Sequence, residues 1–79
     1  MTHLNKSILI ALLDLAQLDQ AADLHQLSLA CGQTSSRIRL ALYELESLGF
    51  VDAGRVRLSF LGLAKAAGLR ARARRLRAA

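Results

Sequence analysis

The stretch "SSRIRLALYELESLGFV", residues 35–51, decides the fold because it carries apolar side chains on two faces of the helix that it predicts. One set recurs at spacings of three and four residues, which is typical of a helix face buried in a core. This set is Ile38, Ala41, Leu42, Leu45 and Leu48. Leu40 and Tyr43 fall on the opposite face, between Arg39 and Ser47. We therefore expect one face to pack on the core and the other to contact a partner.

The residues that flank this helix predict where it begins and ends. Gly32 can adopt a positive φ angle and predicts a turn before the helix. The stretch "QTSS", residues 33–36, offers hydroxyl groups that can cap its free N–H groups. Gly49 suits the position after its last turn.

Two further helices are predicted upstream. The first covers about residues 4–18, with one apolar stripe formed by Leu4, Ile8, Ala11, Leu12 and Leu15 and a second formed by Leu9, Leu13 and Ala16. The second lies near residues 23–31, where Asp19 or Asp23 can cap it. Its inward residues are predicted to be Leu24, Leu27 and Ala30.

Downstream, the apolar period changes from 3.6 to 2 in "FVDAGRVRLSF", residues 50–60. This pattern predicts a short β-hairpin with its turn at Asp52-Ala53-Gly54. Its apolar side is predicted to carry Val56, Leu58 and Phe60, and its polar side Arg55, Arg57 and Ser59. Ser59 can also cap a last helix, whose predicted seam is Gly62, Ala66, Leu69, Ala73 and Leu76.

Composition limits the class of protein. A chain of 79 residues makes one domain with a marginal core, and a hydrophobic fraction of 53% is high for that size. Surplus apolar surface predicts a second subunit, so we expect a homodimer. The longest apolar run, residues 8–13, is far shorter than the roughly 20 residues of a membrane span. With a single cysteine and no signal-peptide pattern, we expect a cytoplasmic protein without a membrane partner.

Charge is distributed unevenly along the chain. Residues 1–52 carry three basic against six acidic residues, a net charge of −3. Residues 53–79 carry eight basic residues and no acid, a net charge of +8. Such asymmetry predicts a polyanionic partner.

The predicted elements give a mainly α fold with a small two-stranded antiparallel hairpin, and the second and third helices meet through a turn that contains glycine, as in a helix-turn-helix. The sequence resembles the winged helix-turn-helix DNA-binding regulators of the MarR-like and ArsR-like group. In those families a buried valine or isoleucine follows the glycine by six residues, as Ile38 follows Gly32. The endings "LESLGFV", residues 45–51, and "LSFLG", residues 58–62, match the other family patterns. The resemblance implies a three-helix core, a β-wing and a C-terminal helix, with the winged helix at residues 1–66 and a basic helix or tail at 67–79.

The family pattern is not followed everywhere. Gln33 stands where these proteins usually place an apolar residue after the glycine. Leu40 stands where their recognition helices often carry a polar or basic residue. The wing is also short, which limits its reach into a groove.

The resemblance implies sequence-specific binding to double-stranded DNA and a role in transcription regulation. The helix at residues 34–48 would read the major groove and the wing at residues 51–60 would contact the backbone. The predicted DNA-binding residues are Thr34, Ser35, Ser36, Arg37, Arg39, Leu40 and Tyr43 on the helix and Arg55 and Arg57 on the wing. Arginine can pair with guanine, and leucine or tyrosine carbon can contact a thymine methyl group.

Other interpretations stay open at this point. Leu40 and Tyr43 would serve equally well to dock a protein partner in an adaptor. The arginine-rich tail is a candidate for phosphate contact or for RNA binding, through Arg70, Arg72, Arg74, Arg75 and Arg77. The candidate dimer contacts are Leu9, Leu13, Ala16, Leu69 and Leu76. Because no catalytic, metal-ligand or cofactor motif is present, we expect no enzyme, no metal and no cofactor, and Cys31 reads as a core residue.

Overall fold

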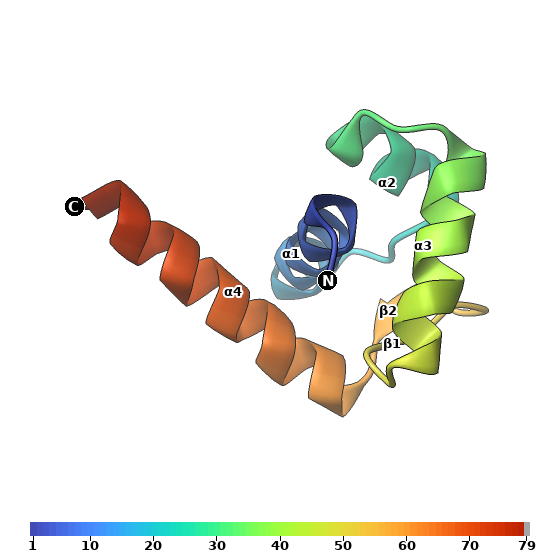
Figure 1. Ribbon diagram of the computed structural model, residues 1–79. Helices are drawn as coiled ribbons and strands as arrows, with labels where there is room; N and C mark the ends of the chain where they lie inside the picture. The colour runs from blue at the N-terminus through green and yellow to red at the C-terminus, as the bar shows by residue number, and fades with distance from the viewer. Residues whose placement is uncertain (79) are drawn as a thin grey trace.

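The computed structural model describes the backbone of residues 1–78 and the side chains of residues 1–76. Within this range the chain forms four helices and one two-stranded antiparallel hairpin (Figure 1). The elements in chain order are α1 (His3–Gln17), α2 (Leu24–Cys31), α3 (Ser35–Ser47), β1 (Val51–Asp52), β2 (Arg57–Leu58) and α4 (Phe60–Ala78). The predicted mainly α architecture with a small antiparallel hairpin is therefore confirmed.

Polar caps set the beginnings of the first three helices. Thr2 caps α1 and Thr34 caps α3, each by accepting a hydrogen bond from a backbone N–H three residues on. Asp23, one of the two predicted candidates, caps α2 in a reciprocal arrangement with Gln26. Between α2 and α3, Gly32 has a φ of 65°, the left-handed conformation that the turn required.

The core lies between α1, α2, α3 and the hairpin. Its fully buried members are Ile8, Leu9, Leu12, Leu13, Leu27, Ile38, Ala41, Leu42, Leu45, Val51 and Ala66. Figure 1 shows α1 end-on, with α4 on one side and α2 and α3 on the other. Because α1 has neighbours on both sides, Leu9 and Leu13 of its second apolar stripe are buried within one chain. The prediction that Leu9 and Leu13 contact a second subunit is therefore wrong.

Three predicted inward positions are exposed. Leu48 caps the C-terminal end of α3, beyond the last turn that faces the core, and Ala30 lies on the solvent side of the short helix α2. Phe60 is 91% exposed because α4 begins there and the strand pattern ends at Leu58. The hairpin pairs Val51 with Leu58, so Leu58 lies against the core as predicted.

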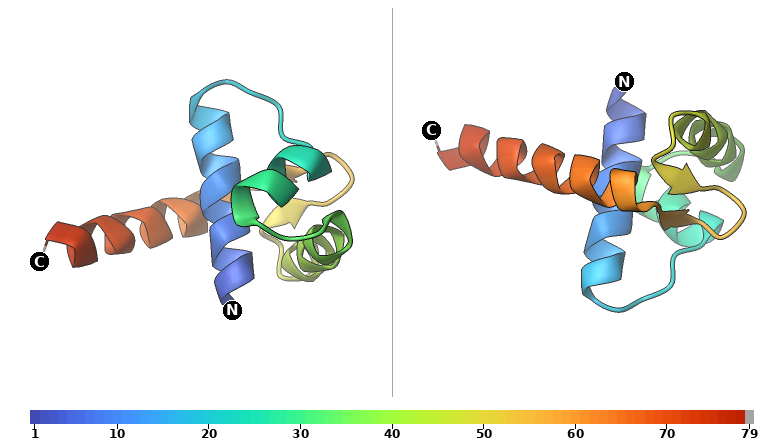
Figure 2. Two further views of the ribbon diagram at one scale, coloured as in Figure 1. Left: turned by 90° about the horizontal axis from the view of Figure 1, so that it is seen from above. Right: turned by 90° about the horizontal axis from the view of Figure 1, so that it is seen from below.

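The last helix crosses α1 and then leaves the domain. Figure 2 shows α4 running steeply across α1, with its C-terminal half extending past the other helices. Ala66 is fully buried and Leu69 is half-buried, but Leu76, on the same seam, is 74% exposed. The predicted boundary between residues 66 and 67 falls inside this continuous helix. We call residues 71–78 the α4 arm.

Candidate nucleic-acid interface

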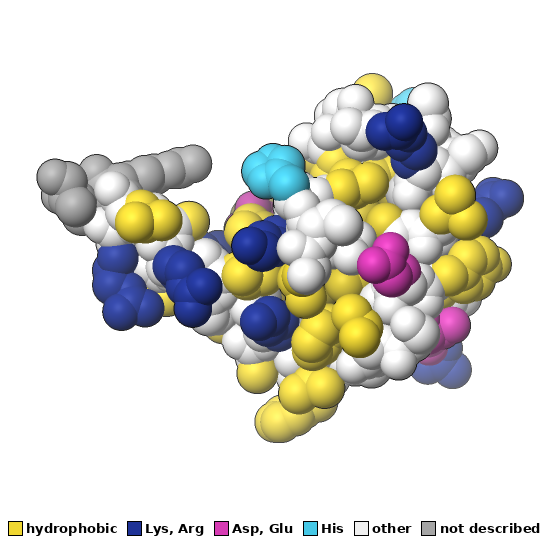
Figure 3. Space-filling model, viewed as in Figure 1, with side chains coloured by type: hydrophobic (Ala, Val, Ile, Leu, Met, Phe, Trp, Pro, Cys, Tyr) yellow, Lys and Arg dark blue, Asp and Glu magenta, His cyan; other side chains and the backbone are white. Residues whose placement is uncertain are grey.

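The outward face of α3 carries Leu40 and Tyr43, the apolar residues that are expected to contact a partner. Ser36, Leu40, Tyr43 and Ser47 are spaced by four, three and four residues, so they share one helix face. All four are exposed, and the exposed fractions of Leu40 and Tyr43 are 70% and 57%. Figure 3 shows hydrophobic side chains at the surface over α3. This face is available to a ligand along its whole length.

The N-terminal end of α3 is polar and open. Thr34, Ser35 and Ser36 are exposed, and the first turn contains no acidic residue. The Thr34 hydroxyl accepts a hydrogen bond from the Arg37 backbone N–H at 3.3 Å. The helix dipole and the free N–H groups of this turn therefore favour a negative group at this end.

Two arginines flank the outward face on opposite sides. Arg39 shares its flank with Glu46, seven residues on, and Arg37 shares the other flank with Glu44. Both guanidinium groups belong to exposed residues, and that of Arg37 donates a long hydrogen bond of 3.5 Å to Gln33. Each flank thus carries one guanidinium group near the N-terminal end of α3 and one carboxylate nearer its C-terminal end.

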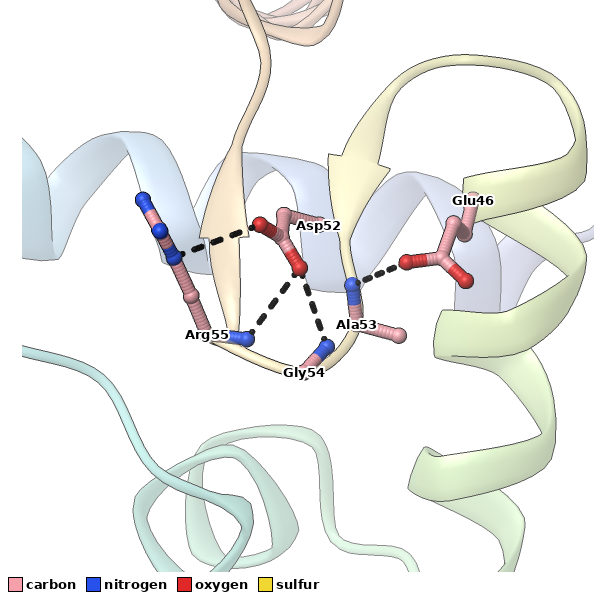
Figure 4. A network of polar contacts seen from close by, with 5 residues as sticks. All are labelled: Glu46, Asp52, Ala53, Gly54 and Arg55. Atoms are coloured by element: carbon pink, nitrogen blue, oxygen red, sulfur yellow. Dashed lines mark hydrogen bonds and ion pairs between the residues drawn. The ribbon is translucent and has the colours of Figure 1, made fainter.

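The hairpin is fixed to the Arg39 flank of α3. A carboxylate oxygen of Glu46 accepts a hydrogen bond of 2.8 Å from the Ala53 backbone N–H (Figure 4). Asp52 closes the turn by accepting hydrogen bonds from the backbone N–H groups of Gly54 and Arg55, at 3.1 and 3.3 Å. Its carboxylate also lies 3.7 Å from the Arg55 guanidinium in an exposed ion pair. These contacts fix the hairpin turn beside α3, while the Arg55 side chain points away from Glu46 (Figure 4) and toward the end of α1.

The charge of α3 and the hairpin together is close to balanced. Their cations are Arg37, Arg39, Arg55 and Arg57, and their acids are Glu44, Glu46 and Asp52. Four cations against three carboxylates leave a net charge of +1. The strongly basic part of the molecule is α4, where Figure 3 shows Lys and Arg side chains gathered.

The structure separates the predicted tail residues into two groups. Arg70 is paired with Asp14 of α1 and donates a hydrogen bond to Gln17, and its side chain is only 13% exposed. The prediction that Arg70 contacts phosphate is therefore corrected, since its guanidinium holds α4 against α1. Arg72, Arg74 and Arg75 are exposed, and the side chain of Arg77 lies outside the described residues. Because α1 stands between α4 and α3, these cations do not lie on the α3 face (Figure 1).

The remaining predicted dimer contacts have different environments. Ala16 is exposed on α1, and Leu69 packs partly on the core. Leu76 lies on the arm with no cover from its own domain. Of the predicted dimer residues, Leu76 is the large apolar side chain that remains free for a second subunit.

Metal-ligand groups, the cysteine thiol and the apolarity of the helices bear on other kinds of function. Among the described residues, no three His, Cys, Asp or Glu side chains gather as metal ligands would. Partial burial raises the pKa of the Cys31 thiol, which disfavours the reactive thiolate. None of the helices in the described part of the chain has the length and apolarity needed to cross a bilayer.

No protein-family model matches this chain, and neither a curated protein nor a solved structure shows significant similarity to it.

Two features were not predicted from the sequence. The side chain of Asn5 is buried in the core, although its position in an apolar stripe of α1 could have indicated this. A cavity lies between the end of α1 and the hairpin, and it joins segments far apart in sequence. No local pattern could have found that cavity.

Proposed function

We propose that this protein is a minimal winged-helix DNA-binding regulator, in which α3 enters the major groove and the hairpin contacts the flanking backbone. The order of elements supports this proposal: α2, the Gly32 turn, α3, and a hairpin that follows directly. The outward face of α3 is exposed from Ser36 to Ser47, as that of a recognition helix must be.

The observation that carries the proposal is the fixed relation between α3 and the hairpin. The Glu46–Ala53 hydrogen bond fixes the hairpin turn to the flank of α3 that bears Arg39. Arg39 would pair with guanine, and Ser36 would bond a base edge or a phosphate. Arg55 and Arg57 would contact phosphates and position the domain without reading sequence.

The mixed character of the outward face fits base contact as well. Leu40 is 70% exposed beside Ser36, so its methyl groups would pack on a thymine methyl group while the hydroxyl makes a polar contact. Since the net charge of this surface is small, the phosphates alone would hold it weakly. We therefore infer that binding is weak on random DNA and gains from a matching base sequence.

A homodimer completes the proposal, because two half-sites raise affinity without new contacts in either half. The arm extends the seam of α4 beyond its own domain, and Leu76 on it is 74% exposed. We propose that the arms of two copies pair along this seam. A sedimentation experiment that finds a monomer at micromolar concentration, with Leu76→Glu no different, would remove the dimer from the proposal.

Selection from a randomised duplex library, followed by binding measured over a salt series, tests DNA recognition. We expect a preferred sequence, an affinity that falls with salt, and a loss of about 1–3 kcal/mol for Arg39→Ala on that sequence. Arg72→Ala, which removes the same charge from the arm, is the matched control and should leave the sequence preference unchanged. If selection enriches no sequence, or if Arg39→Ala retains full preference, α3 is not a recognition helix.

The exposed apolar pair on α3 favours a second candidate function, a docking surface for a protein partner. Leu40 and Tyr43 lie three residues apart, at 70% and 57% exposure, as the anchors of a helix-mediated contact do. If Leu40→Ala and Tyr43→Ala leave DNA binding intact but abolish binding to an identified protein, the adaptor function replaces the first proposal. RNA binding through Arg72, Arg74 and Arg75 remains a third candidate, and a single-stranded RNA competitor in the same assay tests it.

A further inference from the structure

A cavity of about 540 Å³ lies between the C-terminal end of α1, the connection that follows it, and the hairpin. Its volume falls in the range of small-molecule sites in proteins, roughly 300–1,000 Å³. Leu12 and Leu15 of α1 form one wall, and Val56 and Leu58 of the hairpin form the facing wall. The cavity is half-open to solvent, and these apolar residues of two elements distant in the sequence line part of it.

Among the described residues other than glycine, two have positive φ angles, and both line the cavity. Asp19 has a φ of 56° and Val56 a φ of 52°. A β-branched residue rarely adopts this conformation, because its side chain then crowds the backbone. The hairpin turn holds Val56 in this conformation, with its side chain partly buried at the cavity. The cavity is thus built into the fold of the turn.

The polar groups of the cavity have a defined charge pattern. Arg55 and Arg57 contribute two guanidinium groups, and Asp19 contributes one carboxylate. Arg55 is also close to Asp52, at 3.7 Å, which neutralises part of its charge. Within the described part of the chain, Arg57 is in no ion pair, so its charge is available to a ligand.

We propose that this cavity binds a small amphipathic monocarboxylate, with its hydrocarbon part on Leu12, Leu15 and Val56 and its carboxylate on Arg57. Burial of the chain would supply most of the affinity, and the guanidinium would supply orientation through a charge-assisted hydrogen bond. Asp19 disfavours an anion and would limit the affinity. No residue of α3 lines this cavity, but Arg55 and Arg57, which the proposed function assigns to phosphate contact, do line it. Binding to the cavity is therefore tested without DNA.

Titration of the full chain with octanoate, in the absence of DNA, tests the site by calorimetry and by methyl chemical shifts. We expect saturable binding with shifts at Leu12, Leu15 and Val56. Octylamine, which has the same chain and the opposite charge, should bind at least tenfold more weakly. Equal or tighter binding of octylamine would overturn the carboxylate assignment, and the absence of saturable octanoate binding would overturn the site.

Three substitutions of exposed residues then locate the ligand. Arg57→Gln should weaken octanoate binding about tenfold, which is the loss of one charge-assisted contact. Asp19→Asn should tighten it severalfold, because asparagine tolerates the same φ angle and removes the like charge. Ala16→Trp should abolish binding by filling the cavity, since Ala16 lines it.

Arg72→Gln is the matched control, because it removes an arginine charge from α4, away from the cavity. It should change octanoate affinity by less than twofold. Circular dichroism establishes that each variant is folded. If Arg57→Gln and Ala16→Trp bind octanoate as the unmodified chain does, the ligand lies elsewhere and the proposal is wrong.

Discussion

Gly62 of α4 lies directly against the backbone carbonyl of Phe50, so closely that a Cβ atom at this position would overlap the carbonyl oxygen and carbon. The same oxygen accepts a hydrogen bond of 2.9 Å from the Ser59 backbone N–H. The Ser59 hydroxyl accepts from the Gly62 N–H at 3.0 Å and donates to the Gly49 carbonyl. The end of α3, the hairpin and the start of α4 therefore form one compact joint, which sets the direction of the arm.

Replacement of Gly62 by alanine should destabilise the protein through this joint. The added methyl group meets backbone atoms, which cannot rotate away, so we expect a loss of about 1–3 kcal/mol in the free energy of unfolding. Gly68→Ala is the matched control on the same helix, where no atom lies within 4 Å of the added group. This change should raise stability by about 0.5–1 kcal/mol, since alanine is the better helix former. Urea unfolding measures both, and equal effects would mean that α4 does not approach Phe50 in solution.

The buried amide of Asn5 should lower the free energy of unfolding. Its Nδ2 atom is inaccessible and has no hydrogen-bond partner among the described residues. An unsatisfied buried donor costs about 1–3 kcal/mol, so Asn5→Leu, which keeps a similar volume, should raise the free energy of unfolding by about 1–2 kcal/mol. Asn5→Asp should lower it at neutral pH, because the substitution buries a charge. A decrease in stability for Asn5→Leu would show that the amide has a partner, such as a buried water molecule.

The raised pKa of the half-buried Cys31 thiol should slow the alkylation of this thiol in the folded protein. Burial disfavours the thiolate, so iodoacetamide should alkylate the folded protein more slowly than the urea-unfolded protein at the same pH. Because the folded pKa is raised, the thiol's contribution to stability is fully present below the unfolded pKa. It is lost as the pH rises through the folded value. Unfolding should therefore become easier at alkaline pH, and Cys31→Ala should reduce this dependence; alkylation that is faster in the folded state would contradict it.

Local patterns predicted the helices and their ends well. Thr34, Gly32 and Gly49 act through their own backbone neighbourhood, and the structure places each of them where the sequence indicated. The short hairpin followed from the change of period and was also found. Such features depend on interactions over three or four residues, which a sequence displays directly.

The errors concern contacts between distant segments. Leu9 and Leu13 looked like surplus apolar surface, because the sequence does not show that α4 covers one side of α1. Arg70 looked like one cation among several until the structure paired it with Asp14, fifty-six positions away in sequence. The same limit hid the cavity between α1 and the hairpin. Which of several equivalent residues faces inward is decided by tertiary packing.

The carboxylates on α3 offer a test that links the hairpin to DNA binding. Glu44 and Glu46 are both exposed on α3, and each would repel phosphates. Only Glu46 also holds the hairpin, through its hydrogen bond to the Ala53 N–H at 2.8 Å. Glu44→Ala should therefore raise affinity for the selected duplex several-fold by removing a like charge. Glu46→Ala should raise it less or lower it, because the gain is offset by a hairpin that is free to move. Fluorescence anisotropy at two salt concentrations measures the difference, and Glu46→Gln, which keeps an acceptor, should behave like Glu44→Ala. If both alanine variants gain affinity equally, the hairpin does not contribute to the DNA contact.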